Sequence, residues 1–267
     1  MTFFRYIAAG AGRLTILAVG MLSLAMLIMP RPSAIAADDT AHRPVLVELF
    51  TSEGCSSCPP ADEFLARLDA QRVVGGAQVI VLSEHVTYWD RPEWNDPFSL
   101  QSVTDRQQDY GNRFRLDSVY TPQALVDGEA QMTGSDGNAL LRAIAQAAAS
   151  PTIALAIEDA QWSGNAVRFK VRAGAGSTVP PSATLTAAVA DDSAQASIGG
   201  GENAGRKLRY VAVVRAMKNL GKGTPDGREL ELKASDAGKA GPIRLVVFLT
   251  DPRSGHVLGV AEQSLTR

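Results

Sequence analysis

The chain has 267 residues, of which 45% are hydrophobic and 20% are charged, a composition typical of one large globular domain or two modest ones. Its 26 basic and 28 acidic residues give a net charge of −2. This balance argues against a nucleic-acid-binding protein, because neutralising phosphates requires clustered lysines and arginines.

The N-terminal residues have the pattern of an export signal. Arg5 and Arg13 precede a mostly apolar run from Leu14 to Met29, and the small residues at 34–36 follow with signal-peptidase spacing. We therefore predict a cleavable signal peptide over residues 1–37 and a periplasmic or secreted protein, where disulfides form and persist. The alternative is an uncleaved anchor, because the apolar run is near the short end of a membrane span.

The first half of the mature chain alternates strand and helix patterns. Apolar runs at 45–50 and 79–82 predict buried strands, and a helical pattern begins after Cys58. With a helix between them, these two strands should be parallel neighbours. The other elements expected in this half are a helix over about 99–115, a strand at 123–126 that returns at 129–133 through an Asp-Gly turn, and a helix with Leu140, Leu141 and Ile144.

The second half consists of short strand patterns separated by Gly, Pro, Asn and Asp. The expected strands are 152–158, 167–171, 184–189, 208–214, 230–232, 243–249 and 257–260. About seven such strands predict an antiparallel sandwich. The glycine-rich residues 199–205 predict a turn or flexible loop, without the spacing of a phosphate-binding loop. We therefore predict an α/β fold of two domains, residues 43–150 and the all-β, sandwich-like residues 151–267.

Cys55 and Cys58 are the only cysteines, and their C-x-x-C spacing places them at the start of the predicted helix. A helix N-terminus has free amide hydrogens and a partial positive charge, which stabilise a thiolate. The second cysteine is close enough to form a disulfide and release a partner held as a mixed disulfide. We interpret Cys55 as the nucleophile and Cys58 as the resolving thiol.

Two other interpretations of the cysteine pair stay open. A metal site needs two further ligands at suitable spacing, and the chain offers only His42, His85 and His256. A purely structural disulfide is common in exported proteins, although a bridge over so short a loop removes little entropy from the unfolded chain.

The order of a strand, C-x-x-C, a helix and a later Thr121-Pro122 resembles the thioredoxin fold over about residues 43–150. The resemblance implies a cis peptide bond before Pro122 and a position of this proline against the active-site disulfide. The alternative is an ordinary proline that opens a strand. Ser56-Ser57 stands where the best-known thioredoxins have Gly-Pro, so the direction of the redox reaction stays open.

A polar and aromatic stretch follows the second predicted strand. Because ligands gather at the carboxyl ends of parallel strands, we expect this stretch to lie near Cys55. His85 and Asp90 can transfer protons, and Tyr88 and Trp89 can form an apolar wall for a ligand. The candidates for substrate contact or proton transfer are Thr121, His85, Tyr88, Trp89 and Asp90. The alternative is that the aromatic residues only pack this loop.

At a finer level, the chain resembles a family of exported bacterial proteins that combine a thioredoxin-like domain with a domain of unknown function. The matching segments are residues 47–62, His85 with 88–90, 120–123 and 201–206. Together they span nearly the whole mature chain. The family has no established activity, so the resemblance supports the fold and leaves the substrate open.

These observations favour thiol–disulfide exchange through Cys55 and Cys58 outside the cytoplasm. The expected partners are thiols or disulfides of exported proteins, or a redox partner protein, and no cofactor, nucleic acid or membrane is expected after signal cleavage. One alternative is a non-catalytic binding module with a stable disulfide. Another is a copper or heavy-metal binder that uses Cys55, Cys58 and His85.

Overall fold

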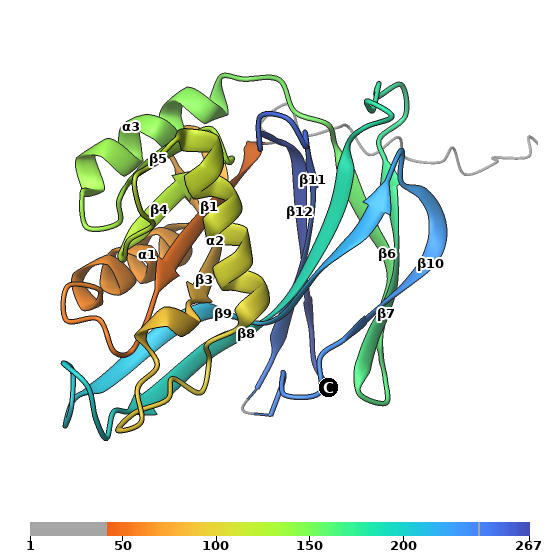
Figure 1. The fold of residues 1–267 in the computed structure, drawn as a ribbon. Helices are drawn as coiled ribbons and strands as arrows, with labels where there is room; N and C mark the ends of the chain where they lie inside the picture. Colours follow the sequence, from red (N-terminus) through yellow and green to blue (C-terminus); the bar gives the residue numbers. More distant parts are fainter. Residues whose placement is uncertain (1–41, 240) are drawn as a thin grey trace, which may run out of the picture. The chain divides into compact units, whose positions relative to one another are not determined.

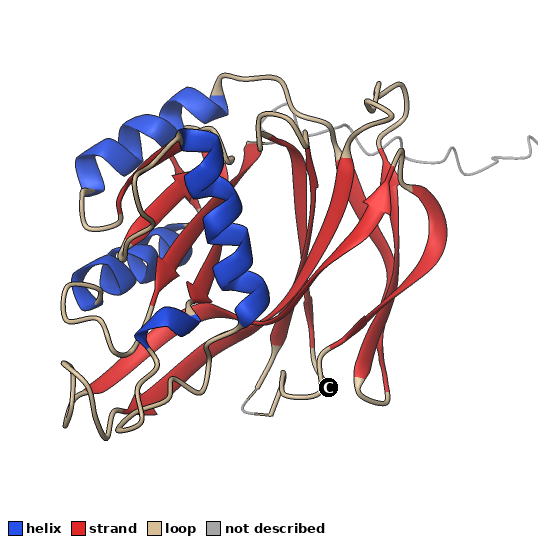
Figure 2. Ribbon diagram, in the orientation of Figure 1, coloured by secondary structure: helices blue, strands red, loops and turns tan. Residues whose placement is uncertain are grey.

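The computed structural model describes residues 42–239 and 241–267, so the predicted signal peptide, residues 1–37, lies outside the described residues. Residues 40–267 form one compact unit. In its described part, a nine-stranded sheet carries three α-helices beside one half, while a three-stranded sheet packs near the other half (Figures 1 and 2). The protein is therefore a mixed α/β protein in which strands predominate. Within this part, no helix is long and apolar enough to cross a membrane.

The first half of the chain forms one end of the large sheet. β1 (Arg43–Thr51) lies parallel to β3 (Ala77–His85) and antiparallel to β4 (Gln123–Val126), which continues into β5 (Ala130–Thr133). The resulting strand order is β3-β1-β4-β5, and the short β2 (Val73–Val74) pairs with β3. The prediction that the first two apolar runs are parallel neighbours is confirmed.

Helices cover both faces of this part of the sheet. Successive side chains of a strand point to opposite faces. Glu48 of β1 therefore contacts α2 on one face, while Leu49 lies near Ala61 of α1 on the other. Burial on both faces explains why β1 is a continuous apolar run. The helices are α1 (Pro59–Gln71), the 3₁₀ turn η1 (Thr87–Trp89), α2 (Gln101–Phe114) and α3 (Gly137–Ala148).

All seven strands expected in the second half are present. They are β6 (Leu155–Ser163), β7 (Ala166–Ala173), β8 (Thr184–Ser197), β9 (Lys207–Lys222), β10 (Asp226–Lys233), β11 (Ile243–Thr250) and β12 (Val257–Leu265). β6, β7 and β10 form the small sheet, and the other four belong to the large sheet in the order β12-β11-β8-β9.

The arrangement differs from a separate sandwich packed against the first domain, because the large sheet continues across the expected boundary at residue 150. β9 pairs with the edge of β3, where Ser83 lies opposite Val213. Without β9, β3 would present an unpaired edge of amide and carbonyl groups. The turn residues near 150 therefore mark the end of a helix and not the end of the sheet.

β11 shows how one sheet serves two hydrophobic cores. Val246 and Phe248 belong to the core beneath the helices, whereas Leu245 and Val247 belong to the core shared with the small sheet. Every residue of β11 is buried, as its nearly unbroken apolar sequence requires.

Candidate functional site

The two cysteines lie in the loop between β1 and α1 and form a disulfide, with their Cα atoms 5.4 Å apart. Cys58 immediately precedes α1, whose first residue is Pro59, so the predicted start of the helix is confirmed. Both cysteines are buried, each with 0% exposure. The pair therefore has the expected position in the fold, but in this conformation solvent does not reach it.

Thr121 and Pro122 are joined by a cis peptide bond, as the resemblance implied, and Trp89 connects them to this loop. Trp89 Nε1 donates a hydrogen bond to Thr121 Oγ1 over 2.7 Å. Trp89 also touches the cysteine loop, because a Cβ on Gly54 would lie 3.3 Å from Trp89 Cβ. Trp89 therefore links the cysteine loop to the Thr121-Pro122 segment.

Pro122 packs next to the first turn of α1. A Cβ on Gly134 would lie 3.1 Å from Ala61 Cβ and 3.2 Å from Pro122 Cβ. Pro122 is therefore placed close to the helical turn that begins directly after the cysteines.

A buried ion pair lies at the end of β3. His85 Nδ1 is 2.8 Å from Asp96 Oδ2, and both side chains are buried. Burial by itself would lower the pKa of His85, but the adjacent Asp96 carboxylate raises it above its usual value. Burial would raise the pKa of Asp96, but His85 and the amides of Glu53 and Phe98 lower it. The geometry therefore favours a charged pair.

Two further carboxyl groups are buried nearby. Burial raises the pKa of Asp62 and of Glu53 to about 7 in each case, against a smaller opposing influence of His85. Asp62 lies one helical turn after Cys58, and neither of its carboxyl oxygens has a hydrogen-bond partner within the described residues. Glu53 Oε2 accepts a hydrogen bond from Trp94 Nε1 over 2.9 Å. Both groups can therefore exchange a proton near neutral pH.

The turn between β8 and β9 covers the cysteine loop. Asn203 Nδ2 donates hydrogen bonds to the carbonyl oxygens of Glu53 and Cys55, over 2.9 and 2.8 Å. The Ser56 amide donates to Glu202 Oε2 over 3.0 Å. We call residues 198–206 the capping segment. It lies at the free end of the long β8–β9 hairpin, on the side of the molecule that also carries the loop after β3 (Figure 1).

The remaining predicted residues have different surroundings. Asp90 accepts hydrogen bonds from the Asp96 amide and from Ser99 Oγ, over 3.1 and 2.9 Å, and so orders the loop that follows η1. These contacts give Asp90 a structural role in that loop, and its charge also contributes to the raised pKa of Glu53. Tyr88 is half-buried against the core, and burial raises its pKa. His42 is exposed.

Sequence reasoning missed several residues of this site, namely Glu53, Asp62, Asp96, Glu202, Asn203 and Tyr210. Tyr210 is buried on β9, and its ring centroid is 4.7 Å from that of His85. These residues come from segments far apart in the sequence, so no local motif connects them. Asp62 alone carried a usable signal, because the spacing of four from Cys58 places both on one face of a helix.

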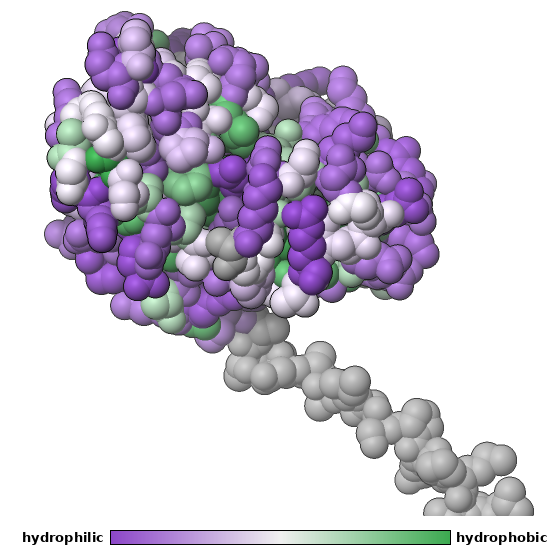
Figure 3. Space-filling model, turned by 90° about the horizontal axis from the view of Figure 1, so that it is seen from below, coloured by the Kyte–Doolittle hydropathy of each residue, from purple (hydrophilic) through white to green (hydrophobic). Residues whose placement is uncertain are grey.

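The surface and the clefts do not point to another site for the predicted chemistry. Among the described residues, the large apolar side chains that are exposed are Val73 at 45% and Leu141 at 38%, so no broad apolar docking patch forms. The face in Figure 3 is accordingly mostly hydrophilic, with small scattered apolar areas.

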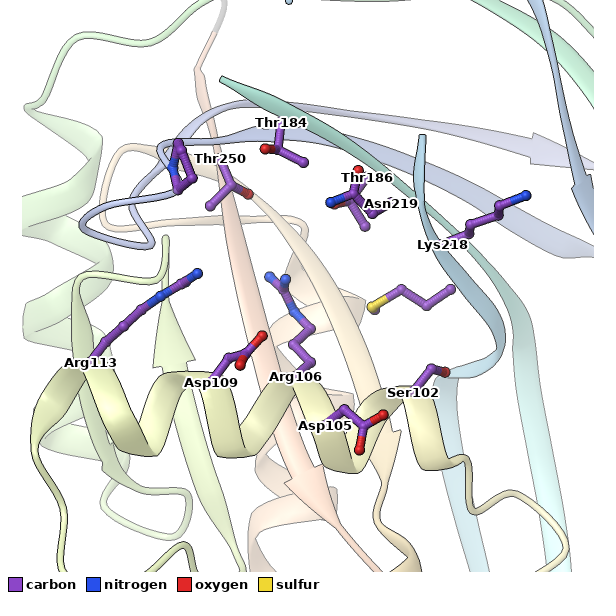
Figure 4. A pocket seen from close by; sticks show the side chains of 12 residues that line it. Ser102, Asp105, Arg106, Asp109, Arg113, Thr184, Thr186, Lys218, Asn219 and Thr250 are labelled. Carbon is purple, nitrogen blue, oxygen red and sulfur yellow. The ribbon is translucent and has the colours of Figure 1, made fainter. Parts of the chain in front are cut away.

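A cleft of about 270 Å³ opens between α2 and the strands β8, β9 and β11 (Figure 4). Its lining includes Arg106, Asp109, Thr184 and Lys218, and none of the residues predicted for the redox site. Within residues 42–239 and 241–267, no group of three or more His, Cys, Asp or Glu side chains is arranged to hold a metal ion.

Comparison with known proteins gives a family but no activity. A search of curated protein sequences gives no match. A crystal structure of a protein from Agrobacterium tumefaciens is similar, with 25% sequence identity, a TM-score of 0.60, and coverage of 83% of this chain and 93% of that chain. A β-glucosidase from Kluyveromyces marxianus aligns over 44% of this chain and 14% of its own, with 13% identity; its TM-score of 0.19 is too low to indicate a shared fold. Residues 46–250, most of the chain, match the family described as "Protein of unknown function (DUF1223)", and the chain belongs to that family.

Proposed function

We propose that this protein is a thioredoxin-like thiol–disulfide exchange protein that acts outside the cytoplasm, with Cys55 as nucleophile and Cys58 as resolving thiol. The observation that carries the proposal is the C-x-x-C disulfide at the start of α1, whose loop is linked through Trp89 to Thr121 and the cis Pro122. The strand order β3-β1-β4-β5, with helices on both faces, supports the thioredoxin-like assignment. The N-terminal sequence supports export.

The start of α1 favours a thiolate on Cys55 once the disulfide is reduced. The partial positive charge at the N-terminus of a helix attracts negative charge. Because α1 opens with Pro59 and Pro60, which have no amide hydrogens, backbone donors for the thiolate come from the preceding loop. Ser57 Oγ lies 3.4 Å from Cys55 Sγ and can donate a hydrogen bond to it. Both effects lower the pKa of a thiol and increase its reactivity near neutral pH.

The proposed reaction consists of two successive thiol–disulfide exchanges. Cys55 Sγ bonds to one sulfur of a partner disulfide, whose S–S bond breaks and whose other sulfur leaves as a thiolate. Cys58 Sγ then bonds to Cys55 Sγ, and the mixed disulfide breaks. The partner gains two electrons and the cysteine pair loses two, and the reverse sequence oxidises a dithiol partner.

Asp62 can accept the proton that Cys58 loses in the second step. It lies one turn beyond Cys58 on α1 and is buried. A carboxyl group with a pKa of about 7 is well suited to this transfer, because the ideal pKa of a general base lies near the working pH.

Partners of polar character fit this protein best. The described surface offers no large apolar patch, and the groups around the cysteine loop that can recognise a ligand are backbone amides and carbonyls. We therefore propose thiols or disulfides of exported proteins, or a dedicated redox protein, as partners.

A second candidate function is a binding module in which the disulfide is permanent. The complete burial of both cysteines favours it, since a buried disulfide is protected from exchange. A redox titration distinguishes the two. A pair that titrates near the potential of its compartment supports exchange, and one that stays oxidised far below that potential supports the binding module.

Replacement of Cys58 with serine tests the exchange proposal directly. We expect Cys58→Ser to accumulate mixed disulfides between Cys55 and exported proteins, because the resolving step is blocked. The complexes should separate on reduction and be absent from the variant in which Cys55 is also replaced with serine. Covalent complexes that form equally in the double variant, or no complexes at all, would contradict the proposal.

A further inference from the structure

The capping segment, residues 198–206, contacts the cysteine loop through polar groups that face the disulfide on its backbone side. Asn203 is 1% exposed, and its side-chain amide donates to both Glu53 O and Cys55 O. Its Oδ1 accepts a hydrogen bond from Arg206 over 2.8 Å. The side chain of Asn203 is therefore fully engaged, and its orientation is set by this network.

Glycines allow the capping segment to approach closely. A Cβ on Gly199 would lie 2.8 Å from the Trp94 ring, and one on Gly200 would lie 2.6 Å from Glu93 O. Gly201 has a positive φ, and a Cβ there would lie 3.6 Å from Gly54 Cα. The glycines thus seat the segment against the loop after β3 and against the cysteine loop at once.

The turn itself is closed by its own backbone hydrogen bonds. The Ile198 amide donates to Arg206 O, and the Gly205 amide donates to Ile198 O. The hydrogen bonds to the cysteine loop are separate from these bonds and come from two side chains, Glu202 and Asn203. The segment can consequently leave the cysteine loop as a unit when those hydrogen bonds break and its glycines separate from Gly54, Glu93 and Trp94.

We propose, on the basis of the proposed exchange function, that the capping segment is a lid that binds the oxidised Cys55–Cys58 loop and leaves it when Cys55 becomes a thiolate. In the closed form both cysteines are buried, so partner sulfurs do not reach them. Glu202 and Asn203 are the residues that hold it closed.

The preference for the oxidised form follows from competition for one amide. In the structure the Ser56 amide, which precedes α1, donates to the Glu202 carboxylate. Because α1 opens with Pro59 and Pro60, which have no amide hydrogens, a Cys55 thiolate depends on the amides of its own loop, and Ser56 is the next residue along it. A negative charge on Cys55 also repels the Glu202 carboxylate, which is bonded to the amide of the next residue, Ser56. Glu202 and the thiolate therefore exclude each other, whereas the uncharged disulfide is compatible with Glu202.

The coupling acts in both directions. If the lid closes more tightly on the disulfide form of the loop than on the thiolate form, the closed lid stabilises the disulfide relative to the thiolate by the same factor. The protein then exposes its cysteines mainly when a partner displaces the lid. A partner that supplies its own amide donor to Glu53 O or Cys55 O can take the place of Asn203.

The rate at which dithiothreitol reduces the disulfide of the native protein tests this lid. Reduction needs the open form, so its rate follows the open population. We expect Asn203→Ala to accelerate reduction about tenfold, since it removes two buried hydrogen bonds, and Glu202→Gln to accelerate it by about threefold. Asn138→Ala on α3 and Glu229→Gln on β10 alter exposed side chains of the same types that bond neither the cysteine loop nor the capping segment, and should leave the rate unchanged.

A second measurement keeps the test independent of the stability of the Asn203 variant. In the wild-type protein, hydrogen exchange at the Ser56 amide should be at least about tenfold faster in the dithiol form than in the disulfide form, because its Glu202 partner is gone. Circular dichroism identifies any variant that unfolds.

The outcomes separate the lid from the exchange function. Wild-type reduction rates in both folded variants, or equal exchange at Ser56 in both redox states, would overturn the lid. If the lid variants accelerate reduction but Cys58→Ser traps no partner, the lid stands and the exchange function fails.

Discussion

At the scale of single residues, the site differs from an exposed redox motif because a cluster of buried ionisable groups surrounds the cysteine loop. Asp62, Glu53, His85 and Asp96 converge there from α1, the cysteine loop, β3 and the following loop. Of these four, His85 and Asp96 form a close ion pair. An unpaired buried carboxyl group favours its neutral form, and so makes the fold sensitive to pH near neutrality.

Asp62→Asn tests this sensitivity. The folded pKa of Asp62 is about 7, above the value of 3.8 for an exposed aspartate. Because folded Asp62 holds its proton more tightly than unfolded Asp62, it contributes stability that is fully present below the unfolded pKa. The free energy of unfolding of the wild type then decreases as the pH rises toward the folded pKa of about 7. The asparagine side chain of the variant does not titrate. We therefore expect the stability of Asp62→Asn relative to the wild type to increase by about 1 kcal/mol per pH unit between about pH 5 and 7.

Urea denaturation at a series of pH values from about 5 to 8 measures this difference. Asp109→Asn, an exposed position on α2, serves as control and should show no such trend. A relative stability of Asp62→Asn that is constant with pH would contradict the assignment of a buried, neutral Asp62.

At the scale of elements, a buried ion pair connects α2 to β1. Arg106 Nε donates to Glu48 Oε1 over 2.5 Å, and Arg106 also bonds Tyr110 Oη, which donates to Glu48 Oε2. Burial would raise the pKa of Glu48, but Arg106 lowers it below its usual value. Glu84 lies in the same cluster, and burial raises its pKa well above the usual value. The positive charge of Arg106 thus balances the negative charge of Glu48, the ionised carboxylate beneath α2.

Arg106→Ala should therefore destabilise the protein by about 3–5 kcal/mol, because it leaves Glu48 buried without its counter-ion. Chemical denaturation at neutral pH measures the loss. Arg142→Ala, an exposed arginine on α3, should change stability by no more than about 0.5 kcal/mol. A similar small change for Arg106→Ala would mean that the ion pair does not hold the helix to the sheet.

At the scale of the whole molecule, the two halves of the chain share one sheet and one of its cores. Ala188 of β8, Ala212 of β9 and Phe248 of β11 belong to the core beneath the helices. The Arg106 guanidinium of α2 also lies over the Phe248 ring, 4.8 Å from its centroid. The region that carries the cysteines is therefore completed by strands from beyond residue 150.

A fragment of residues 42–150 should consequently fail to fold cooperatively, since it exposes the edge of β3 and lacks part of its core. The protein of residues 42–267 should unfold in one transition that is the same by near-ultraviolet and far-ultraviolet circular dichroism. A fragment 42–150 with a cooperative thermal transition of its own would show that the halves are independent domains.

The sequence was informative wherever a structural feature depends on neighbours along the chain. The C-x-x-C spacing, Pro59 at the helix start and the Asp127-Gly128 turn locate the cysteine loop, α1 and the β4–β5 hairpin. Each follows from backbone preferences of the residues themselves. The proline segment at 121–122 was found through its resemblance to a known fold.

The strand lengths were less predictable. β8 and β9 extend well past the runs expected at 184–189 and 208–214. The added parts are mostly polar and mostly exposed or only half-buried, so they lack the apolar pattern by which a strand is predicted. The added part of β8, residues 190–197, leads into the capping segment, which the sequence presented only as a glycine-rich turn. Its position over the disulfide depends on contacts between Asn203 and the cysteine loop, 148 and 150 residues away in sequence.

The sequence by itself determined the cysteine pair, the strand and helix on either side of it, and the alternation of elements over residues 43–150. Only the tertiary structure decided that the disulfide is buried, that Asp62 and Asn203 adjoin its loop, and that the second half of the chain completes the sheet. The physical reason is that backbone preferences and side-chain periodicity act over a few residues. Burial and hydrogen-bond partners, in contrast, depend on which distant segments meet when the sheet closes.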